Sequence, residues 1–235
     1  MTKRIEKYDQ LNSYLIDGNK SDIWLLKESD MEKLKGHMVD LGCEDFISED
    51  LYIGRGVWAR LVKYELAIKN SFNEDLEIGE DQIWNMILLK MNPNCAVDKT
   101  KWYNYTKNPE SATEKFRDNI KVQYTNLMYS CYEILKDGAY KNNFLNKMWE
   151  SCNELCLRYY FHKNYTHSLI YAMIDMNQLL STGPWNMGLH YSWYRNLGVK
   201  AVMKFYILKF GIFVPVFGIR SFMKKIKLKF INNKR

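Results

Sequence analysis

The sequence predicts a mostly α-helical protein with a small β portion, and three observations support this fold class. Hydrophobic residues make up 47% and charged residues 26% of the 235 residues, a composition typical of a globular protein and not of a disordered one. Glycine (12) and proline (4) are scarce, which argues against a sandwich or barrel with many turns. Several segments repeat apolar residues with helical spacing and are long enough to form helices.

The expected elements of the first half are short and lie between polar turns. The clearest is an amphipathic helix over residues 81–91, whose apolar residues recur with helical spacing until Pro93 stops it. The full set is a short strand or one helical turn at 22–27, a helix at 29–41 with Gly42 as its C-cap, an acidic turn region at 43–56, an apolar stretch passing into a helix at 57–68, a polar loop at 70–80, the helix at 81–91, and one or two short strands within 95–105.

Longer helices are expected in the second half. Ser111-Ala112-Thr113-Glu114 is a capping box, in which the Ser and Glu side chains satisfy each other's backbone N–H groups and so open a helix. Its apolar positions are Phe116, Ile120, Tyr124, Leu127, Cys131 and Ile134, and Gly138 closes it. The remaining features are helices at 142–161 and 166–180, a break at Gly183-Pro184, and two helical pieces in the C-terminal part, split around 211–215.

The formal net charge of +7 is unevenly distributed along the chain. Asp175 is the last acidic residue, and eleven Lys and Arg residues follow it. The other 23 basic residues are outnumbered by all 27 acidic residues, so residues 1–175 carry −4 and residues 176–235 carry +11. An acidic-to-neutral body with a basic tail does not favour a protein that binds nucleic acid along a whole face.

The cysteines and the N-terminus predict a cytosolic protein. The five cysteines are odd in number and lack disulfide-like spacing, which indicates reduced thiols. The first ten residues are polar and charged, and no secretory hydrophobic region follows them. The longest apolar run, residues 205–219, is interrupted by Lys209 and is short of the roughly 20 residues of a spanning helix, although a re-entrant or interfacial segment stays open.

One stretch carries a more specific pattern. It reads Gly56-Val57-Trp58-Ala59-Arg60-Leu61, then Gly79-Glu80-Asp81-Gln82, then Tyr103-Asn104-Tyr105 with Asn108-Pro109-Glu110-Ser111. In order and spacing it resembles the second half of family 2 glycosyltransferases of the GT-A type, with Arg60 in place of the family's usual Lys. The likeness covers about residues 50–113.

The resemblance implies a partial GT-A α/β domain followed by a helical C-terminal region. It also implies inverting transfer of a sugar from a nucleotide-sugar donor to a lipid-linked or saccharide hydroxyl, in the synthesis of a bacterial capsule or lipopolysaccharide. By the resemblance, Asp81 is the general base, and Glu80 orients it or hydrogen-bonds the acceptor. The residues implied to bind substrates are Trp58, Arg60, Tyr105 and Ser111.

The chemistry of the residues agrees with these roles, but structural interpretations stay open beside them. Inverting transfer needs a base that takes the acceptor proton, and the start of a helix favours the ionised carboxylate of Asp81. Glu80 and Asp81 also fit plain charge complementation of a helix dipole. Trp58 also fits a core position, and Tyr105 fits an alternating strand.

The sequence lacks one motif that the family carries. No two of its aspartates are separated by a single residue, the arrangement with which the family holds Mg²⁺ or Mn²⁺ on the donor diphosphate. No run of apolar parallel strands precedes residue 50 either. A nucleotide sugar and a divalent metal are therefore implied by the family only. The chain resembles an acceptor-side half, and the alternative is a non-catalytic membrane-associated module, or a fragment needing a partner that supplies the donor-binding half.

Three regions are expected: 1–112 as the acceptor-side part, 113–181 as a helical region, and 182–235 as basic amphipathic helices. The final helix favours binding to an anionic membrane surface, peripherally on the cytoplasmic face of the inner membrane. Binding to nucleic acid and a merely solvated basic helix are the alternatives. The residues expected at the membrane are Phe222, Lys224, Lys225, Ile226, Lys227 and Lys229.

A second cluster, Cys152, Cys156, His162 and His167, is spaced C-x3-C-x5-H-x4-H. A zinc site needs a longer gap between its two pairs so that the chain can fold back. The two cysteines also fit one buried helix face at i and i+4. We therefore expect core packing and assign no metal ligands.

Overall fold

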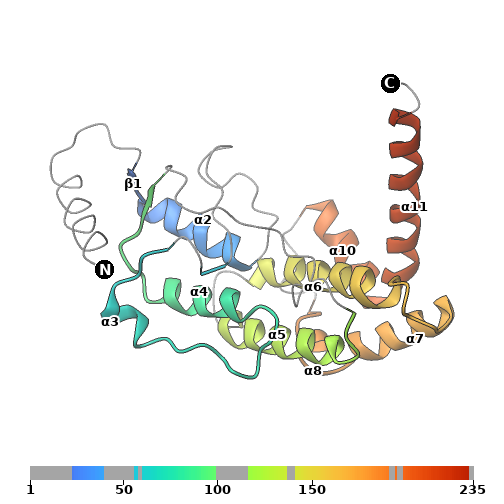
Figure 1. Ribbon diagram of the computed structural model, residues 1–235, viewed down its shortest axis with the longest axis horizontal. Coiled ribbons are helices and arrows are strands. Elements are labelled where there is room, and N and C mark those ends of the chain that lie inside the picture. Colours follow the sequence, from blue (N-terminus) through green and yellow to red (C-terminus); the bar gives the residue numbers. More distant parts are fainter. Residues whose placement is uncertain are drawn as a thin grey trace.

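The computed structural model describes residues 23–39, 56–57, 60–98, 116–136, 141–190, 194 and 198–232 (Figure 1). These residues are mostly helical, which confirms the coarse fold class. The elements in chain order are β1 (Ile23–Leu25), α2 (Glu28–Val39), α3 (Tyr64–Ala67), α4 (Glu80–Lys90), β2 (Ala96–Asp98), α5 (Ile120–Leu135), α6 (Lys141–Leu155), the π-helix η1 (Cys156–Tyr160), α7 (Leu169–Leu180), α8 (Gly183–Met187), α10 (Val199–Lys209) and α11 (Phe213–Asn232).

The two short strands pair antiparallel with each other and thereby place α2 beside α4. Trp24 lies opposite Val97, and the backbone N–H of Leu26 donates to the carbonyl of Cys95 at 2.9 Å. α2 follows β1 and runs away from this sheet, whereas α4 precedes β2 and runs toward it. The two helices are therefore antiparallel, and they pack on each other. The C-terminal end of α2 therefore lies at the first turn of α4.

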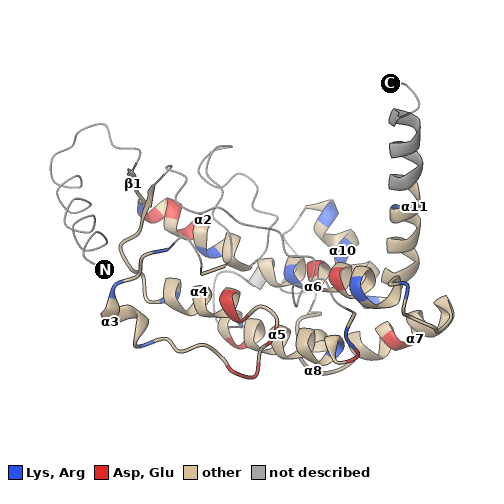
Figure 2. Ribbon diagram, in the orientation of Figure 1, with Lys and Arg blue, Asp and Glu red and all other residues tan. Residues whose placement is uncertain are grey.

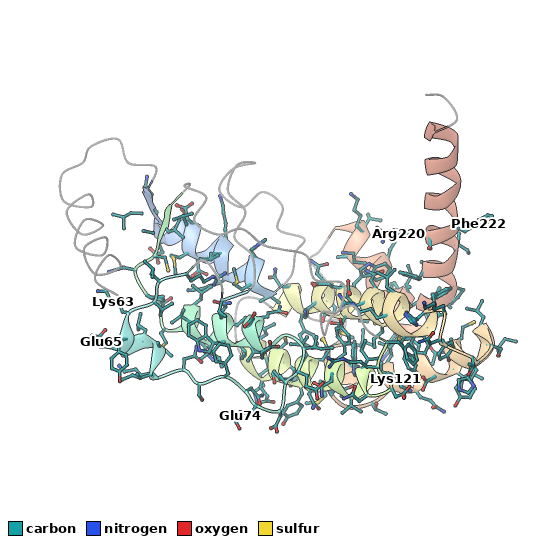
Figure 3. All side chains as sticks on the ribbon, in the orientation of Figure 1. Lys63, Glu65, Glu74, Lys121, Arg220 and Phe222 are labelled. Carbon is teal, nitrogen blue, oxygen red and sulfur yellow. The ribbon has the colours of Figure 1, made fainter. Side chains whose placement is uncertain are left out.

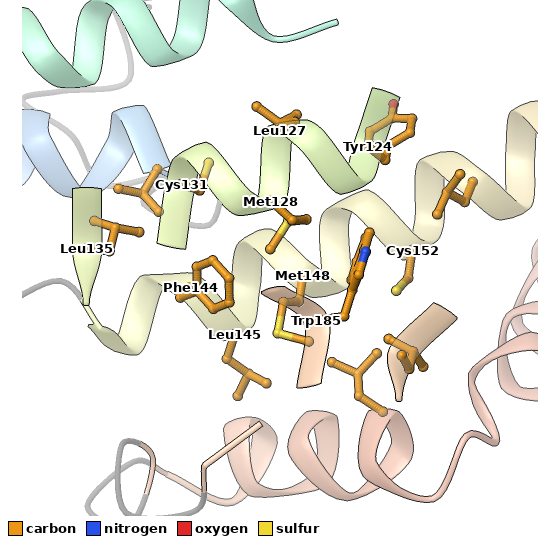
Figure 4. Packing of buried hydrophobic residues seen from close by; sticks show 14 of the residues in the cluster. Tyr124, Leu127, Met128, Cys131, Leu135, Phe144, Leu145, Met148, Cys152 and Trp185 are labelled. Carbon is orange, nitrogen blue, oxygen red and sulfur yellow. The ribbon is translucent and has the colours of Figure 1, made fainter. Parts of the chain in front are cut away.

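The hydrophobic core is centred on the pair α5 and α6 (Figure 4). Each helix presents one face at i, i+3 or i+4 spacing, as the helical period requires. The side chains that meet there are Tyr124, Leu127, Met128 and Cys131 of α5, and Phe144, Leu145, Met148 and Cys152 of α6. Trp185 of α8 is fully buried beside them, and its indole N–H donates to Thr125 Oγ1 at 3.1 Å.

The expected start of the long helix is wrong. α5 begins at Ile120, while Phe116 lies in the turn before it. The ring of Phe116 stacks on Tyr159 at 5.4 Å and on His162 at 5.0 Å between centroids. These tertiary contacts hold Phe116 outside the helix that its spacing suggests. The capping box at 111–114 lies outside the described residues.

The break expected at Gly183-Pro184 is also the start of a short helix. α7 ends at Leu180 with Ser181 as its C-cap, and Thr182 is extended. α8 then begins at Gly183, which has a positive φ of 49°, with Pro184 in its first turn. Proline fits there because the first helical N–H groups have no partner within the helix. The pair Gly183-Pro184 thus opens α8 directly after the extended Thr182.

After α8, the described C-terminal residues form the helices α10 and α11, where the sequence predicts two helical pieces, but Pro215, expected in the break, lies in the first turn of α11. The two helices are separated around Gly211, which has a φ of 66°. A Cβ at Gly211 would lie 1.5 Å from Asn177 Oδ1 of α7, so a larger residue would displace that side chain as well as strain the backbone. The start of α11 is anchored in the core by Phe213 and Val214, and the helix then extends away from the body (Figure 1). Among the described residues, no helix combines the length and the apolar character needed to cross a membrane.

Candidate functional site

The candidate site is built on the first turn of α4, where Glu80 and Asp81 follow Gly79. Gly79 adopts a left-handed conformation with a φ of 81°, and a Cβ there would lie 2.7 Å from Leu127 Cδ1 of α5. Glycine therefore lets α4 start directly against the core helix. This places both carboxylates at the positive end of the α4 dipole, where negative charge is stabilised. Figure 2 shows the acidic first turn of α4 in red.

Arg60 reaches this turn from a separate segment of the chain. Its Nη1 donates to Asn85 Oδ1, and its Nη2 lies 4.0 Å from Met38 Sδ. Asn85 in turn donates through Nδ2 to the backbone carbonyl of Asp81 at 2.8 Å. The guanidinium is thus fixed between the end of α2 and α4, one helical turn beyond Asp81.

The pKa values of the charged groups in the site are shifted by burial and by neighbouring groups. Burial raises the pKa of the Asp81 carboxyl, while a hydrogen bond from the backbone N–H of Val57 and the positive charge of Arg60 lower that pKa. Burial likewise raises the pKa of Glu80, its own backbone N–H lowers it, and the charge of Asp81 raises it.

For Arg60 the directions are reversed, because its charged form is the protonated one: burial lowers its pKa, and negative neighbours raise it. Burial lowers the pKa of the Arg60 guanidinium, and the neighbouring Cys95 and Asp81 raise it. Burial also raises the pKa of the Cys95 thiol, and the positive charge of Arg60 lowers it. The pKa of Asp81, Glu80 and Arg60 is thus shifted in each case toward the uncharged form, a feature that is frequent at functional sites.

The opposite side of the same turn is held by Gln82. Its Nε2 donates to the carbonyls of Met38 and Val39 at 2.7 and 2.9 Å, which satisfies the end of α2. Its Oε1 accepts from Lys147 Nζ of α6 at 2.7 Å, and that Nζ lies 3.9 Å from Glu150 Oε1. Lys147 is only 3% exposed. This buried clamp on α2, α4 and α6 was missed at the sequence level, since a lysine in an amphipathic helix is usually at the surface.

The loop before Gly79 is also pinned to α4. Trp84 Nε1 donates to the carbonyl of Asn70 at 2.6 Å, and Asn70 Nδ2 donates back to the carbonyl of Trp84 at 2.7 Å. The ring of Phe72 stacks on the Trp84 indole at 5.5 Å. The acidic turn is therefore entered by a fixed chain path and not by a free loop.

The structure brings together part of the sequence-predicted site. Glu80 and Asp81 are neighbours in the first turn of α4, and Arg60 lies close enough to Asp81 to shift its pKa. Val57 joins them through its backbone N–H, which the sequence does not single out. The other expected substrate residues, Trp58, Tyr105 and Ser111, lie outside the described residues.

The described part of the chain contains no group of three or more His, Cys, Asp or Glu residues arranged to hold a metal ion. Glu80 and Asp81 supply two carboxylates in the first turn of α4, whereas Mg²⁺ takes about six oxygen ligands. By themselves, these two carboxylates do not make up the ligand set of the family's divalent metal.

Of the second cluster, Cys152 and Cys156 belong to the core, whereas His162 is partly buried and His167 is exposed. Cys152 and Cys156 are buried, and burial raises the pKa of both thiols, as expected for inert packing residues. His162 stacks on Phe116, whereas His167 stacks on Tyr171 at 4.6 Å. The expectation of core packing for the two cysteines is confirmed.

The expected membrane residues lie on α11. Phe222 is 65% exposed, and Figure 3 shows it and Arg220 on opposite sides of the helix. The others, for which only the helical backbone is described, are Lys224, Lys225, Ile226, Lys227 and Lys229.

Compared with models of protein families, with curated proteins and with solved structures, the chain matches none of them.

Proposed function

We propose that this chain is the acceptor-side part of a family 2 glycosyltransferase that acts in bacterial surface polysaccharide synthesis. The observation that carries the proposal is the arrangement around Asp81, a half-buried carboxyl with a raised pKa in the first turn of α4. A raised pKa makes the carboxylate a stronger base than a free aspartate. The helix dipole, the N–H of Val57 and the charge of Arg60 keep its ionised form accessible.

The proposed reaction transfers a sugar to a hydroxyl of a lipid-linked or saccharide acceptor. The acceptor oxygen attacks the anomeric carbon of a nucleotide sugar from the side opposite the diphosphate. As the new C–O bond forms, the hydroxyl proton passes to the Asp81 carboxylate. The bond to the diphosphate breaks at the same time, its electron pair leaves with the phosphate oxygen, and the anomeric configuration is inverted.

Two neighbouring residues, Glu80 and Arg60, assist Asp81 in this proposal. Glu80 lies beside Asp81 in the same turn, and in this proposal it accepts a hydrogen bond from the acceptor and orients it. Arg60 holds the turn through Asn85 and favours the ionised form of Asp81. A phosphate or carboxylate of a substrate is the natural ligand for any guanidinium N–H that faces the site.

A second candidate is a chain that is inactive without a partner. It is favoured by the sequence itself, which contains no two aspartates separated by one residue. In that case the acceptor-side residues keep their roles, and a second protein supplies the groups that bind the nucleotide sugar.

The test is a transfer assay with the full chain, a panel of nucleotide sugars and a lipid-linked acceptor. Asp81→Asn should lower the transfer rate by about 100-fold or more, because a positioned general base contributes 10² to 10⁴ in rate. Asp118→Asn is the matched control, since Asp118 is exposed in the turn before α5 and should leave the rate unchanged. Equal rates for wild type and Asp81→Asn would remove Asp81 from this role.

Calorimetry separates the two candidates. Binding of a nucleotide sugar by the chain alone supports an autonomous enzyme. Absence of binding, restored on adding a protein with the donor-binding half, supports the partner-dependent reading.

The proposal includes a location at the membrane. The +11 charge of residues 176–235 and the exposed Phe222 of α11 support peripheral binding to an anionic surface, on the cytoplasmic side where lipid-linked acceptors are built. Nucleic acid is the less favoured partner, since exposed apolar side chains interrupt the basic residues of this region.

A further inference from the structure

The helix α10 presents an apolar stripe to solvent that the sequence analysis does not single out. Residues at i, i+4, i+7 and i+11 fall on one helical face. Their side chains are strongly exposed, with Val199 at 76%, Met203 at 58% and Phe210 at 69%, and Tyr206 between them stacks on Phe210 at 5.7 Å. Ile212, just after the helix, is also exposed and lines the same shallow apolar depression.

The opposite face of α10 fixes the helix to the body. Phe205 and Leu208 are buried, and α10 packs on α6. Lys204 also turns inward, since its Nζ donates to Asn146 Oδ1 at 2.8 Å and lies 5.8 Å from the centre of the Trp149 ring. The apolar stripe is therefore held facing away from the core and cannot simply rotate inward.

The charges along α10 are placed symmetrically about this stripe. With 100° per residue, Lys200 and Lys209 fall about 90° to either side of its centre. Both lysines are exposed, and Figure 2 shows basic residues on α10. No acidic residue occurs anywhere after Asp175. An apolar strip bordered by cations suits a surface that is apolar inside and negatively charged at its edge.

We propose that this face of α10 lies in the interfacial layer of an anionic bilayer, with Lys200 and Lys209 at the level of the lipid phosphates. The helix has 11 residues and is about 16 Å long, so it lies in the membrane plane and does not cross it. The inference rests on the proposed function for the membrane as partner. It adds that α10, and not only the final helix, is the inserting element.

A bilayer fits this face better than a second copy of the chain. Pairing two stripes would bring the lysines of both copies together without any acidic residue of the region to compensate them. A bilayer has no such repulsion, because its phosphates are negative and its interior accepts apolar side chains of any shape.

The test measures binding of the full chain to vesicles of phosphatidylcholine alone and of phosphatidylcholine with phosphatidylglycerol. The double variant Met203→Glu/Phe210→Glu should lower binding to the anionic vesicles by at least about 10-fold, because two apolar side chains no longer insert. Ile170→Glu on α7 is the matched control, since Ile170 is 70% exposed, and it should bind like wild type. Lys200→Gln and Lys209→Gln should each lower anionic binding about five-fold and leave neutral vesicles unaffected.

Several outcomes overturn the inference. Equal binding by the α10 double variant and wild type would do so, and if Phe222→Glu lowers binding at the same time, α11 is the inserting element and α10 is not. A dimer in solution that Met203→Glu/Phe210→Glu dissociates, without any vesicle binding, would identify a second copy as the occupant. Thermal unfolding followed by circular dichroism checks that each variant is folded.

The result is separable from the enzymatic proposal. Vesicle binding retained by Asp81→Asn supports the α10 surface whatever the transfer assay finds. Transfer to a water-soluble acceptor that is unchanged in the α10 variants supports the catalytic proposal even if vesicles are not bound.

Discussion

At the scale of single residues, the Asp81 carboxyl is subject to opposing influences. Burial favours its protonated form, whereas the Val57 N–H and the Arg60 guanidinium favour the ionised form, and the net effect raises the pKa. The pKa of the neighbouring Glu80 carboxyl is raised as well. The balance at Asp81 leads to two predictions that use different measurements.

Replacing Arg60 with Met should move the acidic limb of the pH–rate profile to higher pH. The positive charge of Arg60 lowers the pKa of Asp81, so removal of this charge lets that pKa rise further. At a given pH, a larger fraction of the Asp81 carboxyl is then protonated and unable to act as a base. The carboxyl carbon shift of Asp81, followed by NMR, measures the same change without an activity assay. Arg117→Met, which removes an arginine paired with Glu77 at 2.6 Å, is the control and should leave the limb in place.

Asp81→Asn should change the pH dependence of stability. Because the folded-state pKa of Asp81 is raised, its protonated form stabilises the fold at low pH, and this contribution is lost as the pH rises through that pKa. The variant cannot ionise, so its free energy of unfolding relative to wild type should increase from acidic to neutral pH. The increase should be no more than about 0.5 kcal/mol, since solvent screens a half-exposed group. Urea unfolding at several pH values measures it, and a pH-independent gap would contradict the assignment.

At the scale of elements, the first turn of α4 is held from two sides. Gln82 and Lys147 tie it to α2 and α6, and Arg60 ties it to α2 through Asn85 and Met38. Gly79 lets it rest on α5. The geometry of the acidic pair therefore depends on four helices, although both carboxylates lie next to each other in sequence.

The Gln82–Lys147 clamp should be energetically coupled. Lys147→Met leaves Gln82 Oε1 buried without its donor and should lower the free energy of unfolding by about 1–3 kcal/mol. Gln82→Met removes a hydrogen-bond acceptor of the buried Lys147 ammonium, which keeps Glu150 at 3.9 Å, and should lower the free energy of unfolding by about 1.5–3 kcal/mol. The double variant should be clearly less destabilised than the sum of both, as urea unfolding of all four proteins would measure. Strict additivity would show that the two side chains act independently.

At the scale of the whole molecule, the C-terminal region is part of the same core as the body. The region expected as separate membrane helices, 182–235, contributes Trp185, Phe205, Leu208 and Phe213 to the hydrophobic cluster around α5 and α6. The charge boundary at Asp175 is therefore not a boundary of packing. The exposed end of α11 is different, because its described side chains from Ile219 onward are mostly at the surface.

Two truncations should distinguish these parts. Removal of residues 224–235 should shift the unfolding temperature by no more than a few degrees. Removal of residues 199–235 should prevent stable folding, because each buried side chain lost contributes about 1.5–3 kcal/mol and a domain of this kind is stable by only about 5–15 kcal/mol. Circular dichroism melting measures both. A folded, cooperative 1–198 fragment would contradict the single core.

The fold was predictable where a local pattern suffices. Residues 81–91 and 166–180 were expected as helices, and α4 and α7 lie there with small shifts at their ends. The start of α5 was not predictable, since the rings of Tyr159 and His162 hold Phe116 outside the helix. The spacing of apolar residues indicates which of them can share a helical face. It does not indicate that one of them packs on a distant part of the chain instead.

Of the candidate site, the sequence singles out only the acidic pair and Arg60, which lie in one motif-like stretch. The backbone N–H of Val57 has no sequence signal, and Lys147 carries the signal of a surface residue. The same limit applies to the tail, where the sequence points to the last helix and the structure exposes the stripe on α10. Helices, their breaks and the −4 and +11 charges follow from neighbouring residues, because backbone hydrogen bonds and formal charge are local properties. Burial, pKa shifts and the choice of outward face depend on which distant segments pack together, and only the folded arrangement of α2, α4, α6 and α10 establishes them.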